Sequence, residues 1–260
     1  MTGFPPPIAG PVLFARFAYP PNQLGYCGPD THRTLLEYAS AEAIDPDLHR
    51  LASEFSGAWP YLQLIAHANG IADPLDRRVV EAYWIGNALL DRVDLSTMGH
   101  SLRDRFEARA GVGWTSLEET IPAGAVPHHA FHVFAVYPWV GLLQDGPSEH
   151  PLTILDRCRS RWGTVTAVEP AAVTVESRPL VWTGHRLELG PLRPERAIRS
   201  LDGYALAGEV EIGATVALHW VWVCSTLSPT QLSSLQTRQQ RQLEMTNERL
   251  AHPGPAEVLA

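Results

Sequence analysis

The chain has 260 residues and a formal net charge of -8, and all 20 of its Lys and Arg residues are arginine. A nucleic-acid partner is therefore not expected, because no basic stripe is available to displace counterions from a phosphate backbone. Hydrophobic residues make up 45% and charged residues 18% of the chain, which is enough apolar side chain to form a core. No basic leader and no run of about 18 apolar residues occurs, so we expect a cytoplasmic protein with no membrane segment.

Prolines characterise the first 29 residues. The seven prolines in this stretch remove backbone donors and fix φ, so we expect an extended arm with turns instead of a helix. Beyond the arm, apolar residues recur at three- and four-residue spacing, as in amphipathic helices. The helices that this spacing predicts cover about 30–39, 46–55, 59–69, 75–92 and 96–110. Residues 1–150 are thus expected to form a mainly α-helical domain with a Pro-rich N-terminal arm.

The pattern changes to a period of two after a turn-rich boundary near residue 150. Alternating apolar residues predict short strands over 164–168, 173–175, 180–182 and 215–223. Ser228-Pro229 then opens a terminal helix, since serine caps a helix well and proline suits its first turn. We expect an α+β protein in which 151–250 form a small β-barrel plus a C-terminal helix and 251–260 form a disordered tail. The proline-containing segment 178–207 is expected to form an extended loop.

Two short motifs lie in this C-terminal part. The first, Cys158-Arg-Ser-Arg-Trp-Gly163-Thr-Val165, has a cysteine followed by a glycine and a valine that lead into a strand. The second begins at Val210 and contains a turn glycine, a strand pattern and His219. Both motifs, in this order, resemble the signatures of the HypC (HupF) family, the iron-handling chaperones of NiFe hydrogenase maturation.

The resemblance implies a barrel and a function. It implies a HypC-like small β-barrel in which Cys158 and His219 hold an iron unit carrying carbon monoxide and cyanide, bound transiently. Thiolate is a soft ligand suited to such iron, and imidazole is a borderline donor able to act beside it. The partners that it implies are a HypD-like scaffold and the NiFe hydrogenase large subunit. On this basis a metallochaperone or accessory protein is favoured over an enzyme.

The surroundings of the two cysteines in this part lead to further expectations. Arg157, Arg159 and Arg161 flank Cys158 and, if they face the thiol, they favour its thiolate; a solvated arginine face is the plainer alternative. We expect Cys158 itself to lie in an exposed loop. Cys224 follows His219 by five residues in one continuous predicted strand and is expected to be a core residue.

The N-terminal half offers weaker candidates. Cys27 and His32 flank a turn before a predicted helix, where the helix dipole lowers a thiol pKa, although a packed turn cysteine is the more common outcome. His128 and His132 are four residues apart and share one face of a helix or a strand, which suits a metal site. Core or surface histidines are the plainer interpretation.

Two other functions remain open from the sequence. One is an enzyme whose helical domain uses Cys27 and the pair His128/His132 to supply or process a ligand of a metal centre. The other is a non-catalytic interaction module that keeps the barrel for docking and has a decayed metal site.

Overall fold

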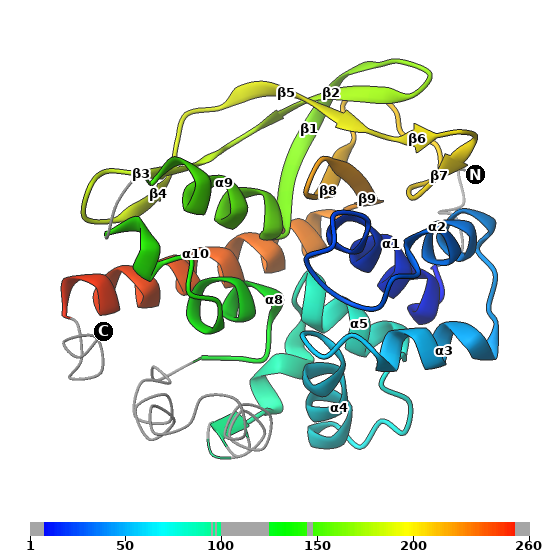
Figure 1. Cartoon of the computed structure of the whole chain (residues 1–260), viewed down its shortest axis with the longest axis horizontal. Coiled ribbons are helices and arrows are strands. Elements are labelled where there is room, and N and C mark those ends of the chain that lie inside the picture. The colour runs from blue at the N-terminus through cyan, green and yellow to red at the C-terminus, as the bar shows by residue number, and fades with distance from the viewer. Residues whose placement is uncertain (1–7, 95, 97, 100–124, 145–147, 253–260) are drawn as a thin grey trace.

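The computed structural model of the chain describes residues 8–94, 96, 98–99, 125–144 and 148–252. It has an α+β fold in which a group of N-terminal helices lies below a sheet, with a long C-terminal helix running across the molecule (Figure 1). The N-terminal helices are α1 (Gly10–Gln23), α2 (His32–Ala41), α3 (Pro46–Ser53), α4 (Trp59–Ala68) and α5 (Arg77–Trp84). No helix within these described ranges is long and apolar enough to cross a membrane.

Helix α1 corrects the expectation of an extended arm. It begins with Pro11 in its first turn, where a missing N–H costs nothing, and it holds Pro20 and Pro21 near its end. Nearly every residue of α1 is buried, so tertiary packing outweighs the poor helix propensity of the prolines. Over α1 the arm prediction was wrong, because the positions of the prolines within a helix matter more than their number; residues 1–7 of the predicted arm lie outside the described residues.

Two other predicted helices differ from the structure or lie outside its described residues. The predicted helix 75–92 is shorter, because α5 ends at Trp84 and Gly86 follows with φ of 101°, a left-handed conformation that interrupts the helix. A 3-10 helix, η1 (Ala88–Arg92), completes this stretch. The predicted helix 96–110 falls almost entirely outside the described residues.

The sheet is built from five strands that pair in the closed order β1-β2-β5-β9-β8, a closed barrel. All its pairs are antiparallel except that of β5 with β9. The strands are β1 (Arg161–Val168), β2 (Ala172–Ser177), β5 (Arg193–Ile198), β8 (Thr215–His219) and β9 (Trp222–Thr226). The strands predicted at 164–168 and 173–175 are therefore confirmed.

Two predictions within the sheet were wrong. The segment 178–207 is not a loop, since it holds β5 and two small hairpins. These hairpins are β3 (Leu180–Trp182) with β4 (Leu187–Leu189), and β6 (Ser200–Leu201) with β7 (Tyr204–Ala205). The segment 215–223 is not one strand either, because Trp220 adopts φ of 54° and the chain reverses there to form the β8–β9 hairpin.

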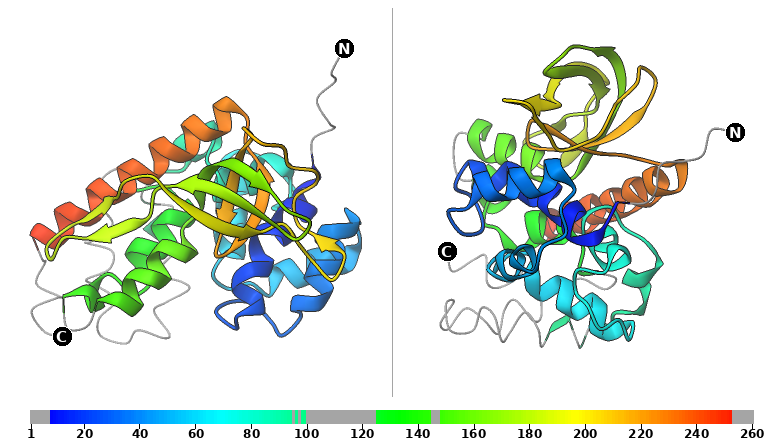
Figure 2. Two further views of the ribbon diagram at one scale, coloured as in Figure 1. Left: turned by 90° about the horizontal axis from the view of Figure 1, so that it is seen from above. Right: turned by 90° about the vertical axis from the view of Figure 1, so that its right-hand side faces the viewer.

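Shorter helical segments connect the N-terminal helices to the sheet, and a long helix follows it. They are α8 (His129–Phe131), the π-helical η3 (His132–Val136), η4 (Gly141–Leu143) and α9 (Glu149–Cys158). Helix α10 (Pro229–Ala251) follows the sheet, and Figure 2 shows it extending past the closed strands. Ser228 caps α10 as predicted, since its side chain accepts from the Gln231 backbone N–H while the Gln231 side chain accepts from the Ser228 N–H. The expected tail lies outside the described residues from 253 onward.

One hydrophobic cluster joins the helices to the sheet. It includes Phe14 and Phe17 of α1 together with Trp222 and Cys224 of β9 and Leu235 of α10. Tyr19 meets Trp222 edge to face with ring centroids 5.2 Å apart. Cys224 is buried in this core, as predicted. The domain boundary near residue 150 stays a prediction, and the residues on its two sides share buried contacts.

Candidate functional site

Three buried side chains with metal-ligating atoms meet where the helices and the sheet touch. They are His129 at the start of α8, Cys158 at the end of α9 and His219 at the end of β8. One ligand-type atom from each lies within 4.8 Å of those of the other two. The sequence predicted the Cys158–His219 pair, and it did not predict His129.

Backbone contacts bring Cys158 next to His219. Strand β1 pairs antiparallel with β8, so Arg161 lies opposite Leu218, three residues after Cys158 and one before His219. The Trp220 N–H, in the turn of the β8–β9 hairpin, donates to the Arg157 carbonyl at 2.7 Å. Arg161 donates from its guanidinium to the Trp220 carbonyl. The end of α9 and the turn after His219 are thus held together on both sides of the thiol.

The three arginines around Cys158 form ion pairs with carboxylates. Arg157 and Arg161 both pair with Glu195 of β5, which also accepts from the Ser177 hydroxyl. Arg159 pairs with Asp156 at 2.8 Å and donates to the Arg178 carbonyl. Arg159 and Arg161 are almost fully buried, so neither the thiolate-activating cluster nor the solvated face describes them. They stabilise the junction between α9 and the sheet.

The thiol of Cys158 is buried, which corrects the expectation of an exposed loop. It packs in an apolar cluster with Ile154, Leu155 and Trp220. Burial raises the pKa of the Cys158 thiol above its ordinary value, because an anion is poorly solvated there. The Cys158 group is therefore a neutral thiol at pH 7.

The imidazole of His219 is oriented by a carbonyl of α1. Its Nδ1–H donates to the Phe17 carbonyl at 2.6 Å, since a carbonyl can only accept. That carbonyl is available because Pro21, four residues later, has no N–H to complete the helical bond. The lone pair of His219 is thereby placed on Nε2, which has no hydrogen-bond partner within the described residues. Burial lowers the pKa of His219 to about 4, so the imidazole is neutral at pH 7.

His129 is held between a carbonyl, a phenol and an indole. Its Nε2 donates to the Cys158 carbonyl at 2.7 Å, and its Nδ1 lies 3.3 Å from the Tyr83 hydroxyl. The Trp84 ring packs against both imidazoles, with centroids 4.4 Å from His129 and 5.3 Å from His219. Burial, with a smaller contribution from His219, lowers the pKa of His129 well below its ordinary value.

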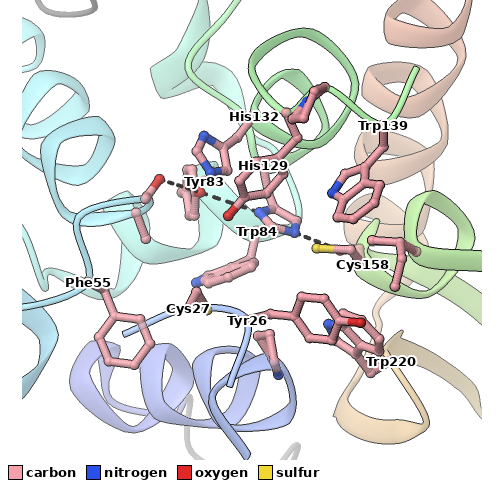
Figure 3. A pocket seen from close by; sticks show the side chains of 16 residues that line it. Tyr26, Cys27, Phe55, Tyr83, Trp84, His129, His132, Trp139, Cys158 and Trp220 are labelled. Atoms are coloured by element: carbon pink, nitrogen blue, oxygen red, sulfur yellow. Dashed lines mark hydrogen bonds between the residues drawn. The ribbon is translucent and has the colours of Figure 1, made fainter. Parts of the chain in front are cut away.

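A cavity of about 180 Å³ lies beside this group, and its walls are mostly apolar. Figure 3 shows His129 and Cys158 facing it between aromatic side chains from the helices and from the β8–β9 turn. His219 is not among the lining residues and reaches the group from the sheet side. The rings that line the cavity include Tyr26, Phe55, Tyr83, Trp84, Trp139 and Trp220.

Two of the weaker candidates also line this cavity. Cys27 lies in the loop after α1, where Asn22 donates to the Cys27 carbonyl at 2.7 Å. Next to it, Gly28 has φ of 79° and lies against the Phe55 ring, where no Cβ would fit. Burial raises the pKa of the Cys27 thiol to about 12, so the predicted lowering by a helix dipole is wrong. His132 lies across the cavity with its Nδ1 3.4 Å from the Tyr61 hydroxyl.

The other two candidates lie away from the cavity lining. His128 precedes α8 and caps it, since its Nδ1 accepts from the Ala130 N–H at 3.1 Å. Burial lowers the pKa of His128 to about 3. His32 is exposed at the start of α2, with its Nδ1 3.6 Å from Asp30. Among the described residues, the convergent group holds neither His128 nor His132, and it takes the histidine between them.

Comparison with known families gives one match. The model of a family of unknown function, DUF6390, matches residues 6–253, and the chain belongs to that family. No curated protein and no solved structure matches the chain.

Proposed function

We propose that this member of the DUF6390 family is an accessory protein of NiFe hydrogenase maturation that receives and passes on an iron unit as its cargo. The observation that carries the proposal is the pairing of β1 with β8, which places His219 beside Cys158. These are the two residues to which the HypC resemblance assigns the iron. That resemblance also supplies the partners, a HypD-like scaffold and the hydrogenase large subunit.

The residues present fit such a cargo. A thiol and two imidazoles make a soft to borderline donor set, which suits iron carrying strong-field ligands better than hard cations. Among the described residues the buried Nε2 of His219 makes no hydrogen bond of normal geometry, although the Cys158 backbone acts on this imidazole and raises its pKa slightly. Its lone pair is therefore available to a ligand. The apolar cavity beside His129 and Cys158 offers room for small uncharged ligands of the iron and keeps water away from them.

The test is loss of hydrogenase maturation in the host when Cys158 is replaced by alanine. Removing one small buried sulfur should lower the free energy of unfolding by about 1 kcal/mol, so the protein should still accumulate. Maturation should fall to the level of the gene deletion. Cys224→Ala is the matched control, since Cys224 is equally buried in the core and lies outside the ligand group. It should leave maturation intact.

A second function, an enzyme that supplies or processes a ligand of the metal centre, is favoured by one specific observation. Cys27 and His132 line the same cavity as Cys158, although they are far apart in sequence. If maturation survives Cys158→Ala but fails with Cys27→Ala or His132→Gln, the enzyme is the better proposal. If all three substitutions are silent while deletion of the gene abolishes maturation, the chain acts by docking alone.

A further inference from the structure

We propose that His129 is the third protein ligand of a metal site completed by Cys158 and His219, and that this site binds a divalent first-row transition metal. The inference rests on the proposed function, because it uses the same thiol and imidazole. It goes beyond that function because the new ligand comes from the helical half of the chain, for which no role has been assigned.

The geometry places His129 with the other two ligands. Its ring centroid is 5.0 Å from that of His219, and the two rings meet at 85°, so each can direct one nitrogen into a shared space. The three ligand atoms all lie within 4.8 Å of one another. Tetrahedral bonds of roughly 2.0–2.3 Å would draw these atoms together by on the order of 1 Å, which side-chain torsions can provide. Its neighbour His128 is just as buried and does not reach the group.

Tyr83 supplies the hydrogen-bond partner that this ligation needs. In the metal-free arrangement, Nε2 of His129 carries the proton and its N–H donates a hydrogen bond to the Cys158 carbonyl. Ligation through Nε2 requires the proton to lie on Nδ1. The Nδ1–H can then donate a hydrogen bond to the Tyr83 oxygen, 3.3 Å away. The Tyr83 hydroxyl can in turn donate to the Gly57 carbonyl at 3.3 Å. This carbonyl–phenol–imidazole chain would orient a metal-bound histidine, and Tyr83 is a positioning residue in it.

The proton balance of binding follows from the same groups. The Cys158 thiol gives its proton to solvent as its sulfur bonds to the cation, so each metal ion bound releases a single proton. His129 and Cys158 face the cavity, so a fourth ligand would enter the coordination sphere from that side. An S/N donor set of this kind binds zinc, cobalt or ferrous iron and discriminates against magnesium and calcium.

The test is titration of the purified full chain with Co²⁺, followed by absorption spectroscopy and by proton release in a weakly buffered solution. The wild-type protein should bind one equivalent with a thiolate-to-cobalt charge-transfer band, and it should release one proton per cobalt. Cys158→Ser should abolish the band. His129→Gln should weaken binding at least 10-fold, while His185→Gln, in the exposed turn between β3 and β4, should leave the affinity unchanged. Tyr83→Phe keeps the ring and should weaken binding 10- to 100-fold.

The outcomes separate this inference from the proposed function. If wild type binds cobalt through Cys158 but His129→Gln and Tyr83→Phe both match wild type, His129 is not a ligand and the iron proposal for Cys158 and His219 stands. If wild type binds no cobalt, the metal site itself is overturned. Hydrogenase maturation in the Cys158→Ala host then decides the proposed function independently. Thermal unfolding of each variant checks the fold, and Tyr83→Phe decides the matter if His129→Gln fails to fold.

Discussion

The sheet half and the helical half of the chain contribute to the candidate site in different ways. The sheet half fixes Cys158 and His219 through backbone pairing and buried ion pairs, which leave the two residues little freedom. The helical half supplies His129 and the groups that orient both imidazoles, namely the Phe17 carbonyl, the Tyr83 hydroxyl and the Trp84 ring. The sheet half alone therefore does not form the candidate site, because the helical half provides one of the three side chains and orients both imidazoles.

The largest effect is expected when the sheet half is produced without the helical half. The sequence predicts that 152–250 fold independently, whereas the shared core leads us to expect that they do not. Removing the helices would expose Trp222 and several smaller apolar side chains, at a cost of roughly 1.5–3 kcal/mol for each large one. The fragment should therefore lack a cooperative thermal transition in near-ultraviolet circular dichroism. A transition as sharp as that of the full chain would show that the sheet half is autonomous.

Arg161 tests the rigidity of the sheet half. Replacing it by alanine leaves Glu195 with only Arg157 and Ser177, and it removes the donor to the Trp220 carbonyl. We expect the free energy of unfolding to fall by up to about 3 kcal/mol, because the largely buried Glu195 carboxylate loses its fully buried partner but keeps Arg157. Chemical denaturation measures this.

The matched control for Arg161 is Arg196→Ala. Arg196 pairs with Glu169 at 3.1 Å, with both side chains largely exposed to solvent. That change should cost less than about 1 kcal/mol, since exposed ion pairs contribute little. Equal effects of the two substitutions would mean that the buried pair does not hold the α9 junction.

The pH dependence of the free energy of unfolding tests the burial of His219, which lies where the two halves meet. The pKa of His219 is about 4 when folded and about 6.5 when unfolded, so the unfolded chain binds more protons between these values. The contribution of His219 to stability is therefore complete above about pH 6.5, is lost as the pH drops toward 4 and changes no further below that. His219 alone should account for about 3 kcal/mol of the loss. Denaturation curves at pH 7 and 4.5 should show a smaller loss in His219→Gln than in wild type.

A surface histidine gives the comparison for this experiment. His185 is exposed in the turn between β3 and β4. The His185→Gln variant should lose as much stability between pH 7 and 4.5 as wild type. If His219→Gln behaves in the same way as His185→Gln, the buried imidazole is not what makes the fold sensitive to acid.

The sequence predicted the site residues of the sheet half and missed those of the helical half. The Cys158–His219 pair could be predicted because the two short motifs that contain these residues resemble the HypC signatures. The period of two predicted strands near both residues, but it did not show that β1 pairs with β8, which lies far along the chain. The ion pair of Arg161 could not be predicted, because its partner Glu195 lies on β5, far along the chain. The Arg159–Asp156 pair is three residues apart at the end of α9, so its spacing could have indicated it.

The helical contribution was missed for physical reasons. His129 was in view within the His128–His132 stretch, but four-residue spacing favoured its neighbours, and a short helix followed by a π-helix does not keep that spacing. The role of the Phe17 carbonyl depends on helix α1, and the prolines of this segment led to the prediction of an extended arm in its place. A signal was present: a proline four residues after a buried position leaves a carbonyl open to a side-chain donor.

Pro21 provides the finest test of this idea. Pro21→Ala restores a backbone N–H that can compete with His219 for the Phe17 carbonyl. The free energy of unfolding should change by less than about 1 kcal/mol, because the new hydrogen bond offsets the greater chain entropy of the unfolded state. The imidazole should lose part of its preference for the proton on Nδ1, which nitrogen chemical shifts of His219 report directly. Pro20→Ala is the matched control, since it frees an N–H toward the Arg16 carbonyl, one residue away from the acceptor of His219. If Pro21→Ala leaves the His219 tautomer as it is in Pro20→Ala, the proline does not act through the open carbonyl, and the helical half orients this ligand by packing alone.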